Sequence, residues 1–312
     1  MMATAHYPVM LEESVAALAL SGGETVVDAT FGGGGHSRRI LQELTNGHLI
    51  AIDRDPEAGE RASDLIGEER FEFVRGGYDE VLRGMGSESV DAILFDLGLS
   101  SYQIDSYGRG FSYVNEGPLD MRMDPESGES AAEFLNTADE AEISGVLAEF
   151  GDITRGEARR VAGEVVRQRP LSTTLDLSEA VRASLGWTKR RGNPSRRVFQ
   201  AVRMYLNDEL GGLSRALGEV ERLLQPGGRL VAITFHSSED RMVKRFIAAR
   251  AGRCVCPPEV PVCVCGEEPT VRKGKVLTPS EKELEENPRS ASARLRSAVR
   301  TSVPLAETGR EV

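Results

Sequence analysis

Short apolar runs alternate with amphipathic stretches over the first hundred residues. Three of these runs end in an aspartate, at 25–28, 48–53 and 90–96. Runs of this length predict buried β-strands, and the stretches between them have apolar residues at helical spacing. Asp55 and Pro56 are typical of the first positions of a helix, which we expect to run to about Ile66. Alternating strands and helices predict a doubly wound α/β sheet over residues 23–101.

The pattern changes after residue 101. Residues 102–129 are rich in Gly, Ser, Tyr, Asp and Pro, and we expect them to form an ordered loop. Helices are predicted beyond this loop, because Ser130 and Thr154 are each followed three residues later by a glutamate, the capping-box spacing. Another short helix is expected from Thr174 to about Leu185.

A long helical stretch is predicted over 195–224, where Pro226 and the two glycines after it would end it. The apolar run 229–235 then returns to a strand, and a final strand is expected near 298–303.

This pattern predicts two domains. Residues 1–104 and 206–312 would form the sheet domain, and residues 105–205 would form a helical insert. An insert at this place would roof the ligand edge of the sheet and present the substrate to it.

A glycine turn follows the first predicted strand, with Asp28 before it and four contiguous glycines, 32–35, within it. Glycine has no Cβ, so the backbone can approach a ligand closely. Asp53 ends the next strand, where a carboxylate can accept hydrogen bonds from both ribose hydroxyls. The contiguous glycines differ from the G-x-G-x-x-G of nicotinamide enzymes, and the preceding acid suits a ligand with an ammonium group, S-adenosylmethionine. The alternative is a turn that only packs strand on helix.

Asp96 ends the third run, and the polar loop 97–101 follows it. Many amino-group methyltransferases have a short Asp/Asn/Ser-Pro-Pro-aromatic motif here that holds the target amine, but this loop contains no proline. An acceptor such as Asp96 can bind the N–H of an exocyclic base amine and localise its lone pair. Positioning of this kind can contribute roughly 7–11 kcal/mol. The alternative is a carboxylate that caps the next turn.

Ten strings along nearly the whole chain resemble the MraW family of small-subunit ribosomal RNA methyltransferases. They are 6–13, 28–37, 52–56, 95–103, 109–112, 117–124, 194–203, 207–209, 235–241 and 287–290. The resemblance implies a Rossmann-like S-adenosylmethionine methyltransferase sheet with an inserted helical substrate-recognition domain. It also implies methylation of the N4 amine of a decoding-centre cytosine, with 16S rRNA of the small ribosomal subunit as the partner.

The resemblance also implies site residues. Tyr78, at a position that the family often fills with Phe, would place its ring against the adenine. His236, which follows the strand 229–235, could steer the cytosine or manage its proton; a role in structuring the loop is equally open. The implied cofactor contacts are Gly34, Gly35, His36, Asp53, Tyr78, Asp96 and Gln103, and the implied catalytic residues are Asp96 and His236.

The net charge of −11 argues against RNA binding until its distribution is considered. Residues 153–205 contain 12 basic and 4 acidic residues, a net charge of +8. Such asymmetry indicates a local surface for phosphate, although solvated helix faces are the ordinary alternative. The predicted RNA contacts are Arg190, Arg191, Arg196, Arg197 and Arg203.

All four cysteines lie in two Cys-x-Cys pairs, at 254, 256, 263 and 265. Four thiolates at this spacing could bind a structural zinc ion, and no catalytic metal is expected. No apolar run reaches the roughly 18–20 residues of a membrane helix. We therefore expect a cytoplasmic protein without a membrane partner, and we leave open whether it forms a homodimer.

Two rival functions are weighed against RNA methylation. A nicotinamide or flavin oxidoreductase could use the same sheet, but the glycine pattern argues against it. A non-catalytic RNA-binding or assembly factor could keep the fold, but the intact Asp53 and Asp96 argue against that.

Overall fold

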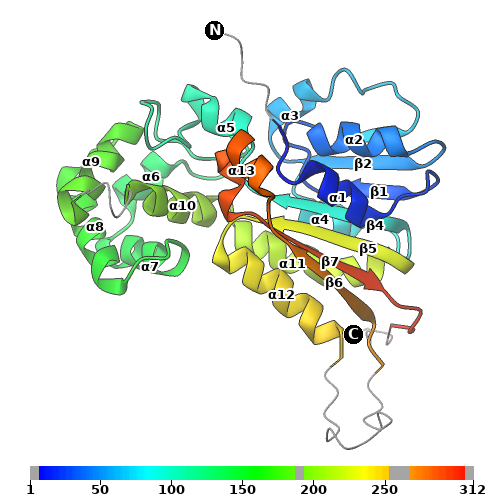
Figure 1. The fold of residues 1–312 in the computed structure, drawn as a ribbon. Helices are drawn as coiled ribbons and strands as arrows, with labels where there is room; N and C mark the ends of the chain where they lie inside the picture. The colour runs from blue at the N-terminus through cyan, green and yellow to red at the C-terminus, as the bar shows by residue number, and fades with distance from the viewer. Residues whose placement is uncertain (1–6, 187–192, 253–267, 306–312) are drawn as a thin grey trace, which may run out of the picture. The chain divides into compact units, whose positions relative to one another are not determined.

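The computed structural model describes residues 7–186, 193–252 and 268–305 (Figure 1). The chain divides into two compact units, which we call the sheet unit, residues 1–98 with 212–312, and the helical unit, residues 99–211. The segment predicted as an insert, 105–205, falls within the helical unit.

The sheet unit contains a seven-stranded sheet in the order β3-β2-β1-β4-β5-β7-β6. The first five of these strands are parallel, whereas β7 runs antiparallel to both β5 and β6. The doubly wound sheet predicted from the apolar runs is confirmed. The strands are β1 (Thr25–Asp28), β2 (His48–Asp53), β3 (Phe71–Arg75), β4 (Val90–Leu97), β5 (Leu224–Thr234), β6 (Val271–Leu277) and β7 (Arg294–Arg300).

Helices cover both faces of this sheet (Figure 1). One face packs against α1, α2 and α3 through residues such as Val15, Ile40 and Ala58. The other face packs against α4, α11 and α12 through residues such as Leu82 and Val243. The helices are α1 (Leu11–Leu18), α2 (Gly35–Glu43), α3 (Pro56–Arg61), α4 (Tyr78–Gly84), α11 (Glu209–Leu223), α12 (Ser237–Arg250) and α13 (Glu281–Glu286), with a 3-10 turn at Pro288–Ser292. The first three residues of α11, 209–211, belong to the helical unit.

The helical unit has a hydrophobic core of its own, which includes Phe134, Val161 and Phe199. The predicted capping boxes at Ser130 and Thr154 are confirmed. In the described residues of both units, no helix is long and apolar enough to cross a membrane. The helices of this unit are α5 (Ser101–Asp105), α6 (Ala131–Thr137), α7 (Glu140–Phe150), α8 (Arg155–Gln168), α9 (Thr174–Leu185) and α10 (Ser195–Leu206), with a 3-10 turn at Tyr107–Arg109.

The predicted long helix over 195–224 is wrong, because the chain breaks between α10 and α11. Asn207 receives the Met123 N–H at 2.7 Å on Oδ1 and donates from Nδ2 to the Met121 carbonyl at 2.9 Å. Asp208 has a φ of +45°, a left-handed conformation that a continuous helix does not contain. The Asn207 side chain therefore ties the helix break to the backbone of the loop 121–123.

Other predicted boundaries also differ from the structure, and the strand predicted over 229–235 begins at Leu224. Helix α3 ends at Arg61 rather than near Ile66. The expected loop 102–129 contains α5 and a 3-10 turn. The last strand runs over 294–300 rather than 298–303, because Leu295 and Ala298 are buried on opposite faces of the sheet.

Candidate active site at the carboxyl edge of the sheet

The parallel strands of the sheet unit bring four predicted side chains to one edge. Asp28, Asp53 and Asp96 lie at or near the carboxyl ends of β1, β2 and β4, and His236 follows β5. Because these strands are parallel, their carboxyl ends share the edge at which open α/β sheets bind ligands.

The glycine turn between β1 and α2 is held by hydrogen bonds at several of its backbone groups. Asp53 accepts the Gly32 N–H on Oδ2 at 2.7 Å. Arg61 donates to the Gly32 carbonyl and Arg38 donates to the Gly33 carbonyl, both at 2.9 Å. The turn is therefore preorganised by charged side chains from α2, β2 and α3.

Packing explains why glycine is needed at two positions of this turn. Gly34 has a φ of +75°, and a Cβ there would lie 2.5 Å from the ring of Phe31. A Cβ at Gly35 would collide with the ring of Pro8. These two glycines thus allow α2 to start against the N-terminal segment, and any cofactor contact would come from their backbone.

The Asp96 carboxylate is the most perturbed group at this edge. Burial, followed by the nearby Asp28 and Glu239 carboxylates, raises the pKa of Asp96 to about 8. Its Oδ1 is buried and has no hydrogen-bond partner among the described residues, although 24 % of the side chain is exposed. A buried acceptor without a partner beside two other acids is suited to a ligand that carries positive charge or donates an N–H.

The pKa values of Asp28 and Asp53 are raised as well. Burial raises the pKa of Asp28 to about 6, although Ser37 Oγ donates to it at 2.6 Å. Burial also raises the pKa of Asp53, against hydrogen bonds from the Asp55 and Gly32 N–H groups. The edge therefore concentrates carboxylates that destabilise one another when ionised.

His36 contacts Asp96 through its ring. Its Nδ1 lies 3.5 Å from Asp96 Oδ2, and its Nε2 lies 3.2 Å from the Val9 carbonyl. The predicted cofactor residue thus links the N-terminal segment to Asp96.

His236 and Glu239 form a second pair at this edge. His236 Nε2 lies 2.7 Å from Glu239 Oε1, and both side chains are less than 10 % exposed. Sequence reasoning missed Glu239, although its i+3 spacing from His236 at a helix start could have indicated the pair.

Two other predicted cofactor residues lie in different units. Tyr78 begins α4 in the sheet unit, and its ring meets that of Phe95 edge-on at 5.6 Å between centroids. Gln103 lies in the helical unit, where Oε1 accepts the Ser100 N–H at 3.2 Å and completes the capping box of α5.

The arginines predicted to contact RNA in the helical unit differ from one another in exposure and in hydrogen-bond partners. Arg203 forms a two-point ion pair with Glu209, at 2.6 and 2.8 Å, and both side chains are only 12 % exposed. Arg196 is exposed, and Arg197 is half-buried and donates to the Asp152 carbonyl at 3.1 Å. Arg190, Arg191 and the four cysteines lie outside the described residues.

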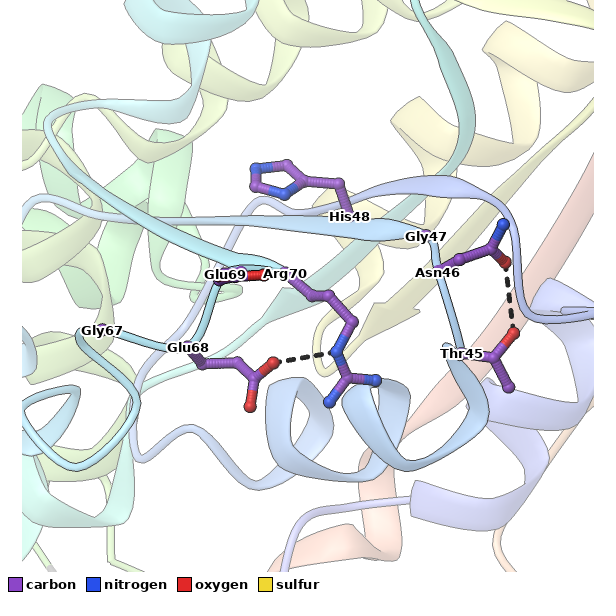
Figure 2. A pocket seen from close by; sticks show the side chains of 8 residues that line it. All are labelled: Thr45, Asn46, Gly47, His48, Gly67, Glu68, Glu69 and Arg70. Atoms are coloured by element: carbon purple, nitrogen blue, oxygen red, sulfur yellow. Dashed lines mark hydrogen bonds and ion pairs between the residues drawn. The ribbon is translucent and has the colours of Figure 1, made fainter.

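A polar hollow of about 680 Å³ lies at the opposite end of the sheet, and Figure 2 shows the side chains that line it. It is lined by residues 45–48 and 67–70, which precede or begin β2 and β3. Arg70 is engaged there with Glu68 and the Leu44 carbonyl. The hollow thus lies at the amino ends of these strands, away from the carboxylate cluster.

Comparisons with known proteins agree on one family. A profile of the MraW methylase family matches residues 3–301. The chain is 66 % identical to the Ribosomal RNA small subunit methyltransferase H of Rubrobacter xylanophilus over 98 % of this chain and 99 % of the relative. It is 43 % identical to the protein of the same name from Caulobacter vibrioides, over 98 % of this chain and 99 % of the relative.

Proposed function

This chain belongs to the MraW methylase family, and from that premise we propose that it methylates the N4 amine of a decoding-centre cytosine in 16S rRNA. Family membership confirms the methyltransferase class and the predicted cofactor, S-adenosylmethionine. The single observation that carries the proposal is the cluster of carboxylates around Asp96 at the ligand edge of the sheet.

The residues of this edge fit a cationic cofactor. Asp28 and Glu239 both repel the ionised Asp96 carboxylate, and a bound positive charge relieves that repulsion. S-adenosylmethionine supplies a methyl group made electrophilic by a sulfonium. We assign its ribose to Asp53, its adenine to Tyr78, and further contacts to the backbone of Gly34, Gly35 and His36 and to Gln103.

Asp96 is proposed to hold the target amine. A nearby positive charge lowers the pKa of Asp96 from about 8, so the carboxylate is ionised when the cofactor is bound. The ionised oxygen accepts an N–H of the amine and localises the nitrogen lone pair. His236 is proposed to act on the same base from the neighbouring strand end.

The helical unit is proposed to bind the RNA backbone. Arg196 and Arg197 begin α10, and Arg160 of α8 belongs to the same surface. Both Arg160 and Arg197 help to lower the pKa of Glu157, after the larger effect of its hydrogen bonds with Thr154. The ion pair with Glu209 makes Arg203 a structural residue in this proposal.

A ribosomal substrate is consistent with action in the cytoplasm. The target cytosine would have to leave its stack, which costs a few kcal/mol in a duplex and less at an irregular site.

The test is methyl transfer from labelled S-adenosylmethionine to small ribosomal subunits from a strain that lacks this protein, with mass mapping of the product. A single N4-methylcytosine in the decoding region is the expected result. Label on another base or another RNA would refute the assigned target. Absence of label despite cofactor binding would favour the non-catalytic rival.

A further inference from the structure

Glu239 is a buried acid directly opposite an imidazole. Its side chain is 4 % exposed, and Oε1 lies 2.7 Å from His236 Nε2. The other oxygen, Oε2, accepts the Phe235 N–H at 3.1 Å. One oxygen is therefore anchored to the backbone at the end of β5, which leaves the other facing the ring.

The imidazole ring of His236 is also enclosed by the protein. Both of its nitrogens are buried, and neither makes a hydrogen bond of good geometry among the described residues. The 2.7 Å approach of Nε2 to Glu239 Oε1 is thus a close polar contact that is not aligned as a hydrogen bond. Small movements of the ring would align it, as happens at sites that tighten around a substrate.

Two other acids of the sheet unit lie near this pair. Burial and the Asp28 carboxylate raise the pKa of Asp96 of β4, and the Glu239 carboxylate raises it further. Asp240 is next to Glu239 on α12, but it is paired with Arg296 of β7 at 2.7 and 2.9 Å and lies 3.8 Å from Arg294. Asp240 thus forms its ion pairs with arginines of β7, whereas Glu239 contacts the His236 ring.

A carboxylate can only accept, so the ring nitrogen that faces it carries the hydrogen. We propose that Glu239 is a positioning residue that holds His236 in the Nε2–H tautomer and leaves Nδ1 as the acceptor for the proton of the target amine. This inference rests on the proposed function.

The proton transfer balances at named atoms. After methylation the amine nitrogen carries one excess proton. The Nδ1 lone pair forms the new N–H bond, and the electron pair of the broken bond returns to the amine nitrogen. The resulting imidazolium is paired with the Glu239 carboxylate, which stabilises it.

The first experiment reads the tautomer directly, without activity. The full chain is labelled with ¹⁵N at histidine, and His236→Asn identifies the His236 signals. In the wild type we expect the neutral ring to be protonated at Nε2 and not at Nδ1. In Glu239→Gln we expect the Nδ1–H tautomer to gain, because the amide oxygen accepts the Phe235 N–H and the amide nitrogen then donates to the ring. Glu285→Gln, which removes an exposed carboxylate from α13, should match the wild type.

An unchanged tautomer in Glu239→Gln would overturn the proposal, as would an Nδ1–H tautomer in the wild type. A folded Glu239→Asp variant provides a second comparison, because it keeps the charge but shortens its reach. We expect an intermediate tautomer ratio in that variant.

The second experiment is the pH dependence of single-turnover methyl transfer to small subunits. For Glu239→Gln we expect the rate to fall at least tenfold, the KM for RNA to change less than twofold, and the acidic limb to move to lower pH. A loss confined to KM, or an unshifted profile, would contradict positioning. If the wild type transfers no methyl group to any RNA, the proposed function fails while the tautomer result stands by itself.

Discussion

The imidazole of His36 faces the carboxylate of Asp96, with Nδ1 3.5 Å from Oδ2. The Val9 carbonyl 3.2 Å from Nε2 can only accept, so in the neutral ring Nε2 carries the hydrogen and Nδ1 the lone pair. That arrangement matches a protonated Asp96, whose pKa is raised to about 8 mainly by burial. The Val9 carbonyl of the N-terminal segment therefore fixes the tautomer in which His36 faces Asp96.

Asp96→Asn should fold and bind the cofactor but lose methyl transfer by at least 100-fold, because the amide cannot replace the charged acceptor. Transfer of labelled methyl groups to small subunits measures this loss. Circular dichroism and cofactor titration serve as controls for folding and binding. Activity near that of the wild type would refute the role of Asp96 in holding the amine.

The stability of the protein should depend on pH through Asp28 and Asp96. Their folded-state pKa values, about 6 and about 8, lie above the unfolded value of roughly 4. The stability that they contribute is therefore fully present below about pH 4 and is lost as pH rises through 6 and then 8. We expect Asp96→Asn to raise Tm relative to the wild type by at least about 3 °C at pH 8.5, and by much less at pH 5.5. Thermal unfolding at the two pH values checks this, and an equal difference at both would contradict it.

Cofactor binding should release protons at pH 7. A cation lowers the pKa of Asp96, so binding drives off part of the proton that the free site holds. Calorimetry in buffers of different ionisation enthalpy should show up to about one proton released with S-adenosylmethionine. S-adenosylhomocysteine has no sulfonium charge and should release less, and equal release by both would mean that this charge is not the cause. In Asp96→Asn the release should largely disappear.

Gly35→Ala should destabilise the protein by about 1–3 kcal/mol, because its Cβ collides with the Pro8 ring. Pro8→Ala removes most of that ring, so the double variant should recover part of the loss. A double-mutant cycle by chemical denaturation measures this coupling. Strictly additive effects would show that the helix start moves to accommodate the added methyl group.

Arg196→Ala and Arg203→Ala should separate RNA binding from stability. Arg196 is exposed at the start of α10, so its loss should reduce the salt slope of RNA affinity by about 1. Arg203→Ala breaks the mostly buried ion pair with Glu209 and should cost roughly 3–5 kcal/mol of stability. RNA titrations at several salt concentrations, together with denaturation, compare the two variants. A reduced salt slope for a folded Arg203→Ala protein would restore that residue to the RNA surface.

Much of the sheet and its ligand edge could be predicted from the sequence. Runs such as 90–96 are apolar because both faces of the strand are buried, and this leaves a periodicity that is easy to recognise. The glycine turn and Asp53 follow from strand ends, so their place at one edge could also be predicted. Boundaries fixed by distant side chains could not be predicted, and Asn207 is an example, because its hydrogen bonds to 121–123 leave no local pattern.

The same limit applies to charged residues of the candidate site. A sequence count cannot distinguish Arg196, which is exposed, from Arg203, whose partner Glu209 lies six residues away across a helix break. The His236–Glu239 contact was missed for the opposite reason. Its spacing is local, but its importance comes from burial of both groups.

Strand β7 lies between β5 and β6 in the sheet, although it follows both of them along the chain. The nascent chain emerges from the ribosome N-terminus first. Strands β5 and β6 therefore leave the exit tunnel before β7, which lies between them. Until residues 294–300 have emerged, β5 keeps an unpaired edge that another nascent chain can bind. The sheet can therefore be completed only late in translation, after the whole helical unit has been synthesised.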